Sequence, residues 1–452
     1  MKCYSARYCT AILLSLGLAI VYGLKVNYHV AVVAMVNHTA LAILDGKNVT
    51  EEESGEDGPF EWSHFIQGIQ LSAYFWGYMI SEIPGGRVAE VYSAKWTMFV
   101  AVGVNVVFTL LVPLLSSISA YAIVVMRVMV GLAGGISFPG THVLLARWSP
   151  PKERSLMSSI AYCGTAAGTV IFTLISGPIA NGLGWQFIFY IEGGISALWL
   201  IVWSILGADF PEKQRFMSAE EKEFMVNAFK EEGGGGEHGT LKVPWKAVFS
   251  SAPFWAIIIA HLCSNWGWYM VLTELPTYMK NVLNFKIKEN ALLSALPYFC
   301  MFIFSLTLGK CIDILRSKEL ISTTVGRKIA TGIASIVPGF CFAALCFITE
   351  PIVAVILMTV SITGIGGMYC GFLSNHIDLS PNFAGTLMAI TNTIASIPGI
   401  LVPLFVGWLC EEDSSISSWR IVFYVTIVLY IIEVIVYLIL GSGDEQPWNR
   451  AA

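Results

Sequence analysis

Long apolar runs separated by short polar segments dominate the chain. An α-helix rises 1.5 Å per residue, so about twenty apolar residues cross the ~30 Å hydrocarbon core of a bilayer. Runs of that length recur about twelve times, and the pattern predicts an all-α polytopic membrane protein with about twelve transmembrane helices. They lie near residues 10–36, 65–88, 95–115, 119–146, 155–181, 186–207, 253–280, 290–314, 326–348, 352–374, 383–410 and 420–441.

The longest polar stretch inside the chain separates the sixth run from the seventh. It covers residues 209–250 and contains four consecutive glycines at 233–236 among many Glu and Lys residues. We therefore predict an N-terminal six-helix bundle (1–208), a cytoplasmic linker (209–250), a C-terminal six-helix bundle (251–441) and a cytoplasmic tail (442–452). Six spans on either side of a linker is the layout of a two-bundle transporter, whose substrate site lies near the midplane between the bundles. A channel or a membrane enzyme could also have twelve helices.

Positive charges collect on one side of the predicted helices. The residues are Lys2, Arg7, Arg87, Lys95, Arg147, Lys152, Arg154, Arg316, Lys318, Arg327 and Lys328. Because cytoplasmic loops carry the excess of Lys and Arg, this side is predicted to be cytoplasmic, with both termini inside. The first opposite loop, 37–63, is acidic and contains glycosylation sequons at Asn37 and Asn48, so we expect it outside and glycosylated. The first run has no small-residue cleavage site and is expected to be a retained helix rather than a signal peptide.

Composition narrows the class of protein. Hydrophobic residues make up 56% of the chain and charged residues 13%, about half the charged fraction of a soluble domain. The net charge of -5 is scattered, with no basic run suited to nucleic acid. The ten cysteines lack paired or metal-type spacing, which indicates reduced thiols. We find no nucleophile and base constellation and no metal-ligand cluster, so neither an enzyme nor a resident cofactor is expected.

Two cations fall inside the apolar runs. Lys25 lies roughly 20 Å along the first helix from Ala11, and Arg127 follows an apolar stretch in the fourth. Neither has an acidic residue one turn away on its own helix, so a bound anion could neutralise both. The alternative is that each pairs with a carboxylate from another helix, for which the candidates are Glu82, Glu192 and Glu274.

Aromatic and amide side chains crowd the same spans. Tyr22, Tyr74, Tyr78, Asn265 and Tyr269 could line a pocket in which hydroxyls and amides bond a small anion while rings exclude water. Aromatic stripes in membrane helices are also common as packing or interfacial belts, and that alternative stays open. His29 and His261, the histidines deepest in the predicted spans, are expected to make interhelical hydrogen bonds rather than a proton relay.

Several motifs are shared with a known family. Residues 86–95 (GRVAEVYSAK) resemble the cytoplasmic signature of the major facilitator superfamily, with Glu90 in place of the usual Asp and Ser93 in place of Gly. Residues 75–78 (FWGY), 83–86 (IPGG), 148–155 (WSPPKERS) and 375–381 (NHIDLSP) resemble the anion and cation symporter family, solute carrier family 17. The likeness runs from the first span to residues 446–448 (QPW) and is strongest to sialin-like proteins and invertebrate inorganic phosphate cotransporters.

The resemblance implies roles for particular residues. Lys25 and Arg127 occupy the places of the family's two anion-binding arginines, and Tyr22, Tyr74 and Tyr78 fall where sialin-like proteins line the cavity. Gly86, Glu90 and Lys95 belong to the motif that controls the conformational change.

The resemblance also bears on coupling. Proton-coupled members carry glutamates three and seven residues after the second arginine, where this chain has Val130 and Gly134. We therefore expect coupling to Na⁺ or to membrane potential more than to H⁺, although Glu82, Glu274 or Asp378 could carry a proton from a displaced position.

The sequence thus predicts a secondary transporter of a small organic anion or inorganic phosphate. We expect alternating access in a monomer, in the plasma membrane or in an endolysosomal or vesicular membrane. A non-transporting receptor or sensor with the same fold is the alternative. Phosphate, an acidic sugar, an acidic amino acid and urate all remain open as substrates, because Lys25 is a point charge where arginine would offer a planar fork for a carboxylate.

Overall fold

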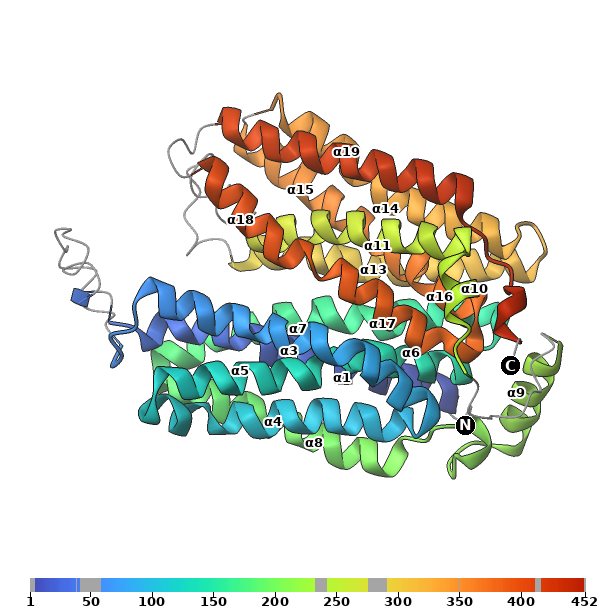
Figure 1. Cartoon of the computed structure of the whole chain (residues 1–452), viewed down its shortest axis with the longest axis horizontal. Coiled ribbons are helices and arrows are strands. Elements are labelled where there is room, and N and C mark those ends of the chain that lie inside the picture. The colour runs from blue at the N-terminus through green and yellow to red at the C-terminus, as the bar shows by residue number, and fades with distance from the viewer. Residues whose placement is uncertain are drawn as a thin grey trace.

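The protein is almost entirely helical (Figure 1). The computed structural model describes residues 5–37, 39–40, 58–231, 242–274, 291–348, 350–410 and 416–450. Within these residues, 10 helices are long and apolar enough to cross a membrane. Two more helices, α3 and α11, are not counted in these 10 and run alongside them in the two bundles (Figure 1). The prediction of an all-α polytopic membrane protein is confirmed.

The first half of the chain forms one bundle. Its helices are α1 (Ala6–Met35), α3 (His64–Val91), α4 (Ala94–Ile118), α5 (Ala120–Gly135), α6 (Ser137–Trp148), α7 (Arg154–Leu183) and α8 (Trp185–Leu206). Small residues let these helices pack closely. A Cβ at Gly131 of α5 would collide with the Tyr74 carbonyl of α3, and one at Gly168 of α7 would collide with the Ala19 carbonyl of α1.

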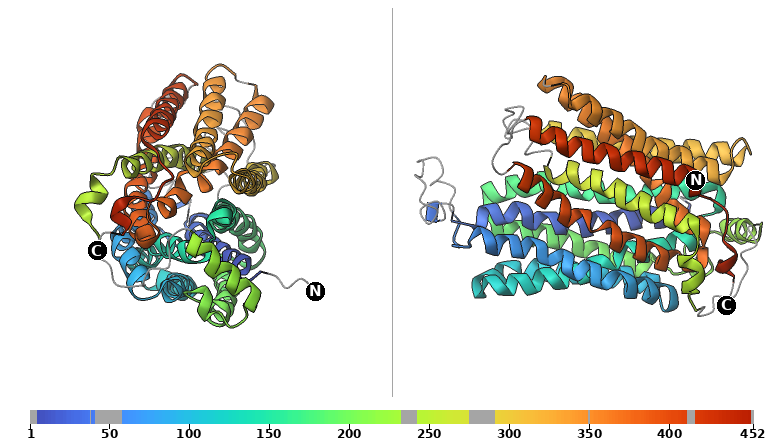
Figure 2. Two further views of the ribbon diagram at one scale, coloured as in Figure 1. Left: turned by 90° about the vertical axis from the view of Figure 1, so that its right-hand side faces the viewer. Right: turned by 45° about the horizontal axis from the view of Figure 1, so that its top comes forward.

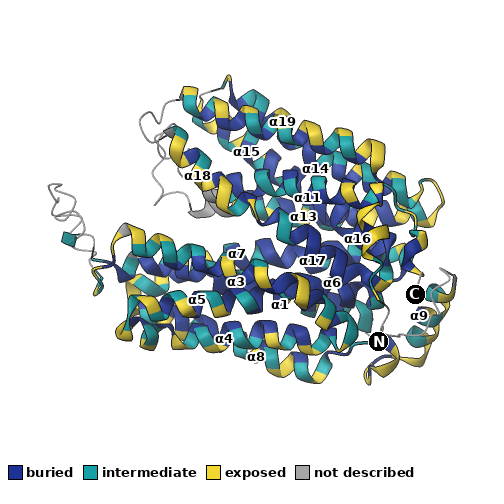
Figure 3. Cartoon of the chain, in the orientation of Figure 1, coloured by how far each residue is buried: buried dark blue, intermediate teal, exposed yellow. Residues whose placement is uncertain are grey.

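The second half forms the other bundle, and the two lie side by side (Figure 2). Its helices are α11 (Ala252–Tyr269), α13 (Ala291–Ser317), α14 (Thr323–Leu345), α15 (Pro351–Ile365), α16 (Phe372–Leu379), α17 (Ala384–Ala395), α18 (Pro398–Cys410) and α19 (Ile416–Leu440). Buried residues concentrate where the bundles meet, around α6, α7 and α17, and exposed residues lie on the outward faces of helices such as α8 and α19 (Figure 3). The apolar outward faces suit contact with lipid tails.

Three predicted spans are interrupted rather than continuous. The run 119–146 is divided at Ile136 into α5 and α6, and 352–374 is divided by a 3₁₀ turn, Gly366–Tyr369, between α15 and α16. The run 383–410 is divided between α17 and α18, just before Pro398. Proline cannot donate the backbone hydrogen bond that would continue α17. Gly367 allows the 3₁₀ turn to approach α14, since a Cβ there would be 2.6 Å from the Ala330 carbonyl oxygen.

Two helices lie in the described part of the linker, and each packs against a different bundle. Glu221 of α9 (Ala219–Glu231) accepts hydrogen bonds from the Ser5 hydroxyl and from the backbone N–H groups of Ala6 (2.8 Å) and Arg7 (3.2 Å), and so caps α1. Burial raises the pKa of Glu221, but these hydrogen bonds outweigh it and leave the pKa lowered. In α10 (Trp245–Phe249), Val248 is buried in an apolar cluster with Phe254 of α11.

The start of α1, α9 and the final 3₁₀ turn Pro447–Asn449 all lie at one end of the molecule, which we call the linker end (Figure 1). Near this end α3 meets α17 across the two bundles. Glu90 accepts from the backbone N–H and the hydroxyl of Thr386, both at 2.7 Å, and pairs with Arg87 at 2.6 Å. A Cβ at Gly86 would be 2.8 Å from the Gly385 carbonyl oxygen, so glycine is required for this approach.

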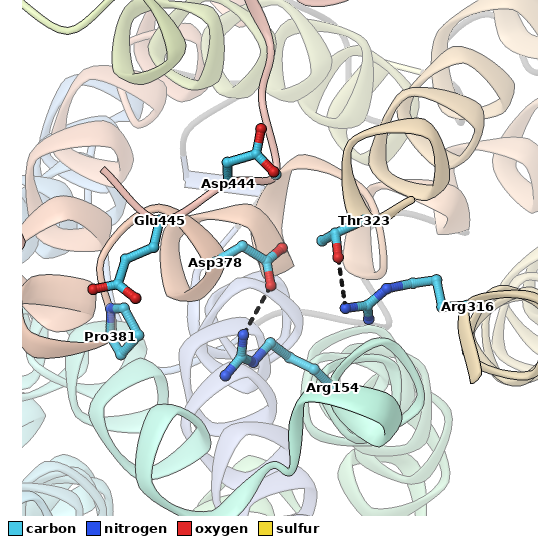
Figure 4. Close-up of a pocket in the computed structure, with 8 residues that line it drawn as sticks. Arg154, Arg316, Thr323, Asp378, Pro381, Asp444 and Glu445 are labelled. Atoms are coloured by element: carbon cyan, nitrogen blue, oxygen red, sulfur yellow. Dashed lines mark hydrogen bonds and ion pairs between the residues drawn. The ribbon is translucent and has the colours of Figure 1, made fainter. Parts of the chain in front are cut away.

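A second contact at the linker end is ionic. Asp378 of α16 pairs with Arg154 of α7 at 3.0 Å and with Arg327 of α14 at 2.6 Å, and all three side chains are buried. Arg154 and Asp378 line a pocket with Arg316, Thr323 and residues of the C-terminal tail (Figure 4). The bundles are therefore held together at this end by buried charge.

Candidate functional site

Lys25 lies in a cage of four aromatic rings. Its Nζ is 4.5 Å from the ring centroid of Phe75, 5.0 Å from Tyr74, 5.3 Å from Tyr22 and 6.0 Å from Tyr269. The side chain is only 7% exposed. Cation–π attraction strengthens when the charge is removed from water, so the rings stabilise a buried ammonium. Because Tyr269 belongs to α11, the cage joins both bundles.

Helical spacing builds this cage. Tyr22 precedes Lys25 by three residues on α1, which places both on one face. On α3, Tyr74 and Tyr78 are four residues apart, and their rings stack at 5.6 Å. The structure thus brings together Lys25, Tyr22, Tyr74 and Tyr269, with Tyr78 one turn further along α3.

Arg127 also lies close to the Tyr74 ring. Its guanidinium carbon is 5.2 Å from the centroid of Tyr74 and 5.0 Å from that of Tyr28. Its Nε donates to the Gln70 carbonyl at 3.2 Å and its Nη1 to the Lys25 carbonyl at 3.3 Å. Among the described residues, its buried Nη2 has no hydrogen-bond partner. One donor of this guanidinium is therefore left for a ligand.

Neither cation is neutralised by a described carboxylate. Across the described ranges, no ion pair includes Lys25 or Arg127. Glu82 and Glu192, proposed above as alternative partners, bond other residues, since Glu192 accepts from Ser176 at 2.7 Å. The structure therefore does not support pairing with either of them. The Glu274 backbone belongs to the π-helical turn Met270–Glu274, and its side chain lies outside the described residues.

Glu82 joins the bundles just beyond the cage. The Asn392 amide of α17 donates to the Glu82 carboxylate and, at 2.9 Å, to the Tyr78 hydroxyl. Glu82 is fully buried, and in the described part of the chain its second oxygen, Oε2, has no partner. The hydrogen bond between Glu82 and Asn392 is therefore part of the contact between α3 and α17.

Other predicted site residues lie apart from the cage. Asn265 donates to the Ala395 carbonyl at 2.9 Å and fastens α11 to the break between α17 and α18. Lys95 donates to the Ser204 carbonyl at 2.9 Å within the N-terminal bundle, whereas Gly86 and Glu90 lie at the contact described above. Asp378 also lies at the linker end, where it forms ion pairs with Arg154 and Arg327. Asn37 accepts from the Ala40 N–H at 2.7 Å, and Asn48 is outside the described residues.

The sequence did not reveal a chain of buried histidines across the bundle contact. The Leu373 carbonyl oxygen is 2.9 Å from His142 Nε2 and 3.0 Å from His376 Nδ1. A carbonyl only accepts, so both nitrogens carry hydrogen. Thr391 then lies between His376 Nε2 (2.8 Å) and His261 Nδ1 (3.1 Å). His261 thus makes the expected interhelical hydrogen bond, but no spacing in the sequence indicates its partners.

The two packed bundles, the interrupted helices and the caged cations between them define a membrane transporter. Residues 7–403 match the Major Facilitator Superfamily model. The chain belongs to this superfamily and, within it, to the anion and cation symporter family, solute carrier family 17. It is a transporter of this family rather than an enzyme, and the receptor alternative is not favoured.

Relatives cover nearly the whole chain. It is 36% identical to a "Putative inorganic phosphate cotransporter" of Drosophila melanogaster, over 99% of this chain and 87% of that protein. It is 36% identical to human sialin, over 99% and 91%, and 31% identical to human vesicular glutamate transporter 2, over 98% and 75%.

Solved structures share the fold at low identity. The proton:xylose symporter XylE has a TM-score of 0.71 at 13% identity, covering 99% of both chains. The human organic anion transporter MFSD10 has a TM-score of 0.65 at 11% identity, covering 95% of this chain and 98% of that one.

Proposed function

We propose that the protein carries a small organic anion or inorganic phosphate by alternating access, with Lys25 and Arg127 as its anion-binding cations. The observation that supports this most directly is that two buried cations lie close to the Tyr74 ring without a described carboxylate partner. An uncompensated charge inside a bilayer costs at least about 2.5 kcal/mol, and a bound anion would offset this cost for both cations. The names of the relatives, sialin and phosphate cotransporter, agree with an anionic substrate.

The described contacts fit one state of such a cycle. Hydrogen bonds and ion pairs from Glu90, Arg154 and His142 close the linker end, which we propose to be cytoplasmic because Lys and Arg collect there. An anion bound at Lys25 would contact rings from both bundles, because Tyr269 comes from α11. Neutralising the cations would remove the cost of burying them while the bundles rock around the site. A monomer contains all of these groups.

Coupling is proposed to use Na⁺ or membrane potential more than H⁺. Val130 and Gly134 follow Arg127 by three and seven residues on α5, and neither residue has a group that can titrate. Moving one net charge across the membrane is worth ~2.3 kcal/mol per 100 mV, enough for a large concentration ratio. A membrane potential of this size therefore suffices to drive accumulation when the transported species together carry a net charge.

Reconstitution into liposomes tests the proposed function. We expect saturable uptake of at least one of labelled phosphate, glucuronate, glutamate and urate, with accumulation driven by a sodium gradient or a potassium–valinomycin potential. Each gradient is imposed alone. The absence of saturable uptake for every anion would contradict the proposed transport. Accumulation driven by a pH gradient alone, with potential clamped and Na⁺ absent, would contradict the proposed coupling.

Topology is tested separately. We propose that loop 37–63 faces outside and is glycosylated, in a plasma or endolysosomal membrane with both termini cytoplasmic. Glycosidase treatment of protein from eukaryotic cells should lower its apparent mass, and changing both Asn37 and Asn48 to glutamine should abolish this shift on a gel. A shift that persists in the double variant would place the glycan elsewhere.

A further inference from the structure

A buried acid in the C-terminal bundle has no counterpart in the site described above. Glu433 lies on α19, the last membrane helix, and is 0% exposed. Within the described residues, neither of its carboxylate oxygens has a hydrogen-bond partner, and no ion pair reaches it. Asp378, the buried acid of α16, differs from Glu433 because it forms ion pairs with two arginines.

Hydroxyl groups surround Glu433 without satisfying it. Tyr430, one turn earlier on α19, presses its hydroxyl against α11, where a Cβ at Gly267 would collide with it. Across the described chain, the hydroxyls of Tyr430 and Ser264 both lack partners. Ser335 of α14 faces the carboxylate, although its hydroxyl donates to the Thr331 carbonyl at 2.9 Å. The described residues around Glu433 thus offer oxygen atoms from α14 and α19, and the face of α11 that meets Tyr430 adds Ser264, but none of these groups carries a positive charge.

An ionised carboxylate in this place is unstable on its own. The titratable groups that face it are Cys263 of α11 and Tyr430, and none supplies a cation at neutral pH. The nearest described arginines on α14 and α19 are engaged elsewhere, because Arg327 pairs with Asp378 and Arg420 donates to the Cys346 carbonyl at 2.6 Å. Transfer of an unpaired charge into such surroundings costs several kcal/mol, so the acid must hold a cation.

We propose that Glu433 binds the monovalent cation that is carried together with the anion. This cation is Na⁺ under the coupling proposed above, and H⁺ if a pH gradient alone drives accumulation. Both cations neutralise the carboxylate, and both use its free oxygens. The proposal rests on the proposed transport function and deepens it by giving the coupling ion a place in the C-terminal bundle.

α11 connects this place to the anion site. Gly267 of α11 lies against Tyr430, and Ser264, three residues earlier, shares that face of the helix. Tyr269, at the end of the same helix, lies close to Lys25. Asn265 fastens α11 to α17 at 2.9 Å from the Ala395 carbonyl. A cation at Glu433 would attract the hydroxyls of Ser264 and Tyr430 and so shift α11. This shift would move the Tyr269 ring, which lies beside the proposed anion site. If cation binding changes the affinity for the anion through α11, anion binding changes the affinity for the cation by the same factor. Symport requires such coupling between the two ligands.

The change Glu433→Gln tests this assignment, because glutamine matches the shape of a neutral carboxyl but holds no exchangeable cation. In proteoliposomes we expect cation-driven accumulation of the anion to fall at least tenfold, while anion exchange without a gradient stays within about twofold of the unaltered protein. The arm that is lost, sodium gradient or pH gradient, identifies the cation. Failure of the proposed transport would instead remove exchange in the unaltered protein.

Two further variants keep the result decisive. The matched control Glu192→Gln changes a buried acid of the N-terminal bundle that accepts from Ser176, and accumulation should survive it. Where Glu433→Gln does not fold, Tyr430→Phe removes only the unpartnered hydroxyl and should raise the half-saturating cation concentration severalfold. Full gradient-driven accumulation by Glu433→Gln, equal loss in both glutamine variants, or an unchanged cation dependence in Tyr430→Phe would overturn the assignment.

Discussion

Replacing Arg127 or Lys25 with glutamine is expected to reduce saturable anion uptake at least about 100-fold. Each change leaves the anion buried against a site that has lost one of its two cations, and an uncompensated buried charge costs about 3–5 kcal/mol. A difference of 1.4 kcal/mol corresponds to a factor of ten, so at least two orders of magnitude follow. The measurement is the initial rate of labelled-anion uptake into proteoliposomes that contain equal amounts of protein.

Expression and glycosylation should stay near normal, because these residues serve the ligand rather than the fold. The control Lys310→Gln removes an exposed cation from α13 and should leave uptake unchanged. Lys25→Arg keeps the charge and adds a planar fork, so it should retain uptake and shift preference toward carboxylates. Full uptake by Lys25→Gln or by Arg127→Gln would reject the role assigned to that residue.

The change Asp378→Asn is expected to lower both stability and transport. The amide would leave Arg154 and Arg327 buried without their shared carboxylate, at a cost of about 3–5 kcal/mol. We expect a fall of several degrees in the melting temperature of the detergent-solubilised protein, followed by fluorescence-detected gel filtration, and at least a tenfold loss of uptake.

A neighbour of Asp378 provides the control. Asp444 lines the same pocket (Figure 4), but it is exposed and its recorded side-chain partner is Ser442 at 3.0 Å. Asp444→Asn should therefore change neither quantity. If Asp378 carried a coupling proton instead, the neutral asparagine would mimic its protonated form. A stable Asp378→Asn protein that exchanges anions but no longer accumulates them would show that the residue couples transport.

The apolar pattern predicted most of the architecture, but not its breaks. Burial in lipid demands long apolar runs, so each run could be read from hydropathy. The divisions at Ile136 and at Gly366–Tyr369 depend on how closely another helix approaches the glycines beside them. The approach of a neighbouring helix is a property of the packed bundles and cannot be read from hydropathy. The apolar runs that contain these breaks therefore appear continuous in the sequence.

The candidate site was predicted in part for a similar reason. Lys25 and Arg127 stand out because a charge in an apolar run is rare. Asp378 stands out equally, yet its arginines come from α7 and α14 and only the packed structure shows that it is paired. Glu433 also interrupts an apolar run, 420–441, but was not selected as a site residue, and the sequence does not reveal that it lacks a partner among the described residues.

The attachment of the linker to both bundles sets a limit on their movement. Glu221 ties α9 to the start of α1, and Val248 ties α10 to the cluster around Phe254. Only residues 232–241 lie between the described ends of these two halves, and ten residues of fully extended chain reach at most about 35 Å. The linker therefore limits how far α9 and α10 can move apart. Shortening it one glycine at a time, until uptake first slows, would measure how far the two halves must travel apart at this end in each transport cycle.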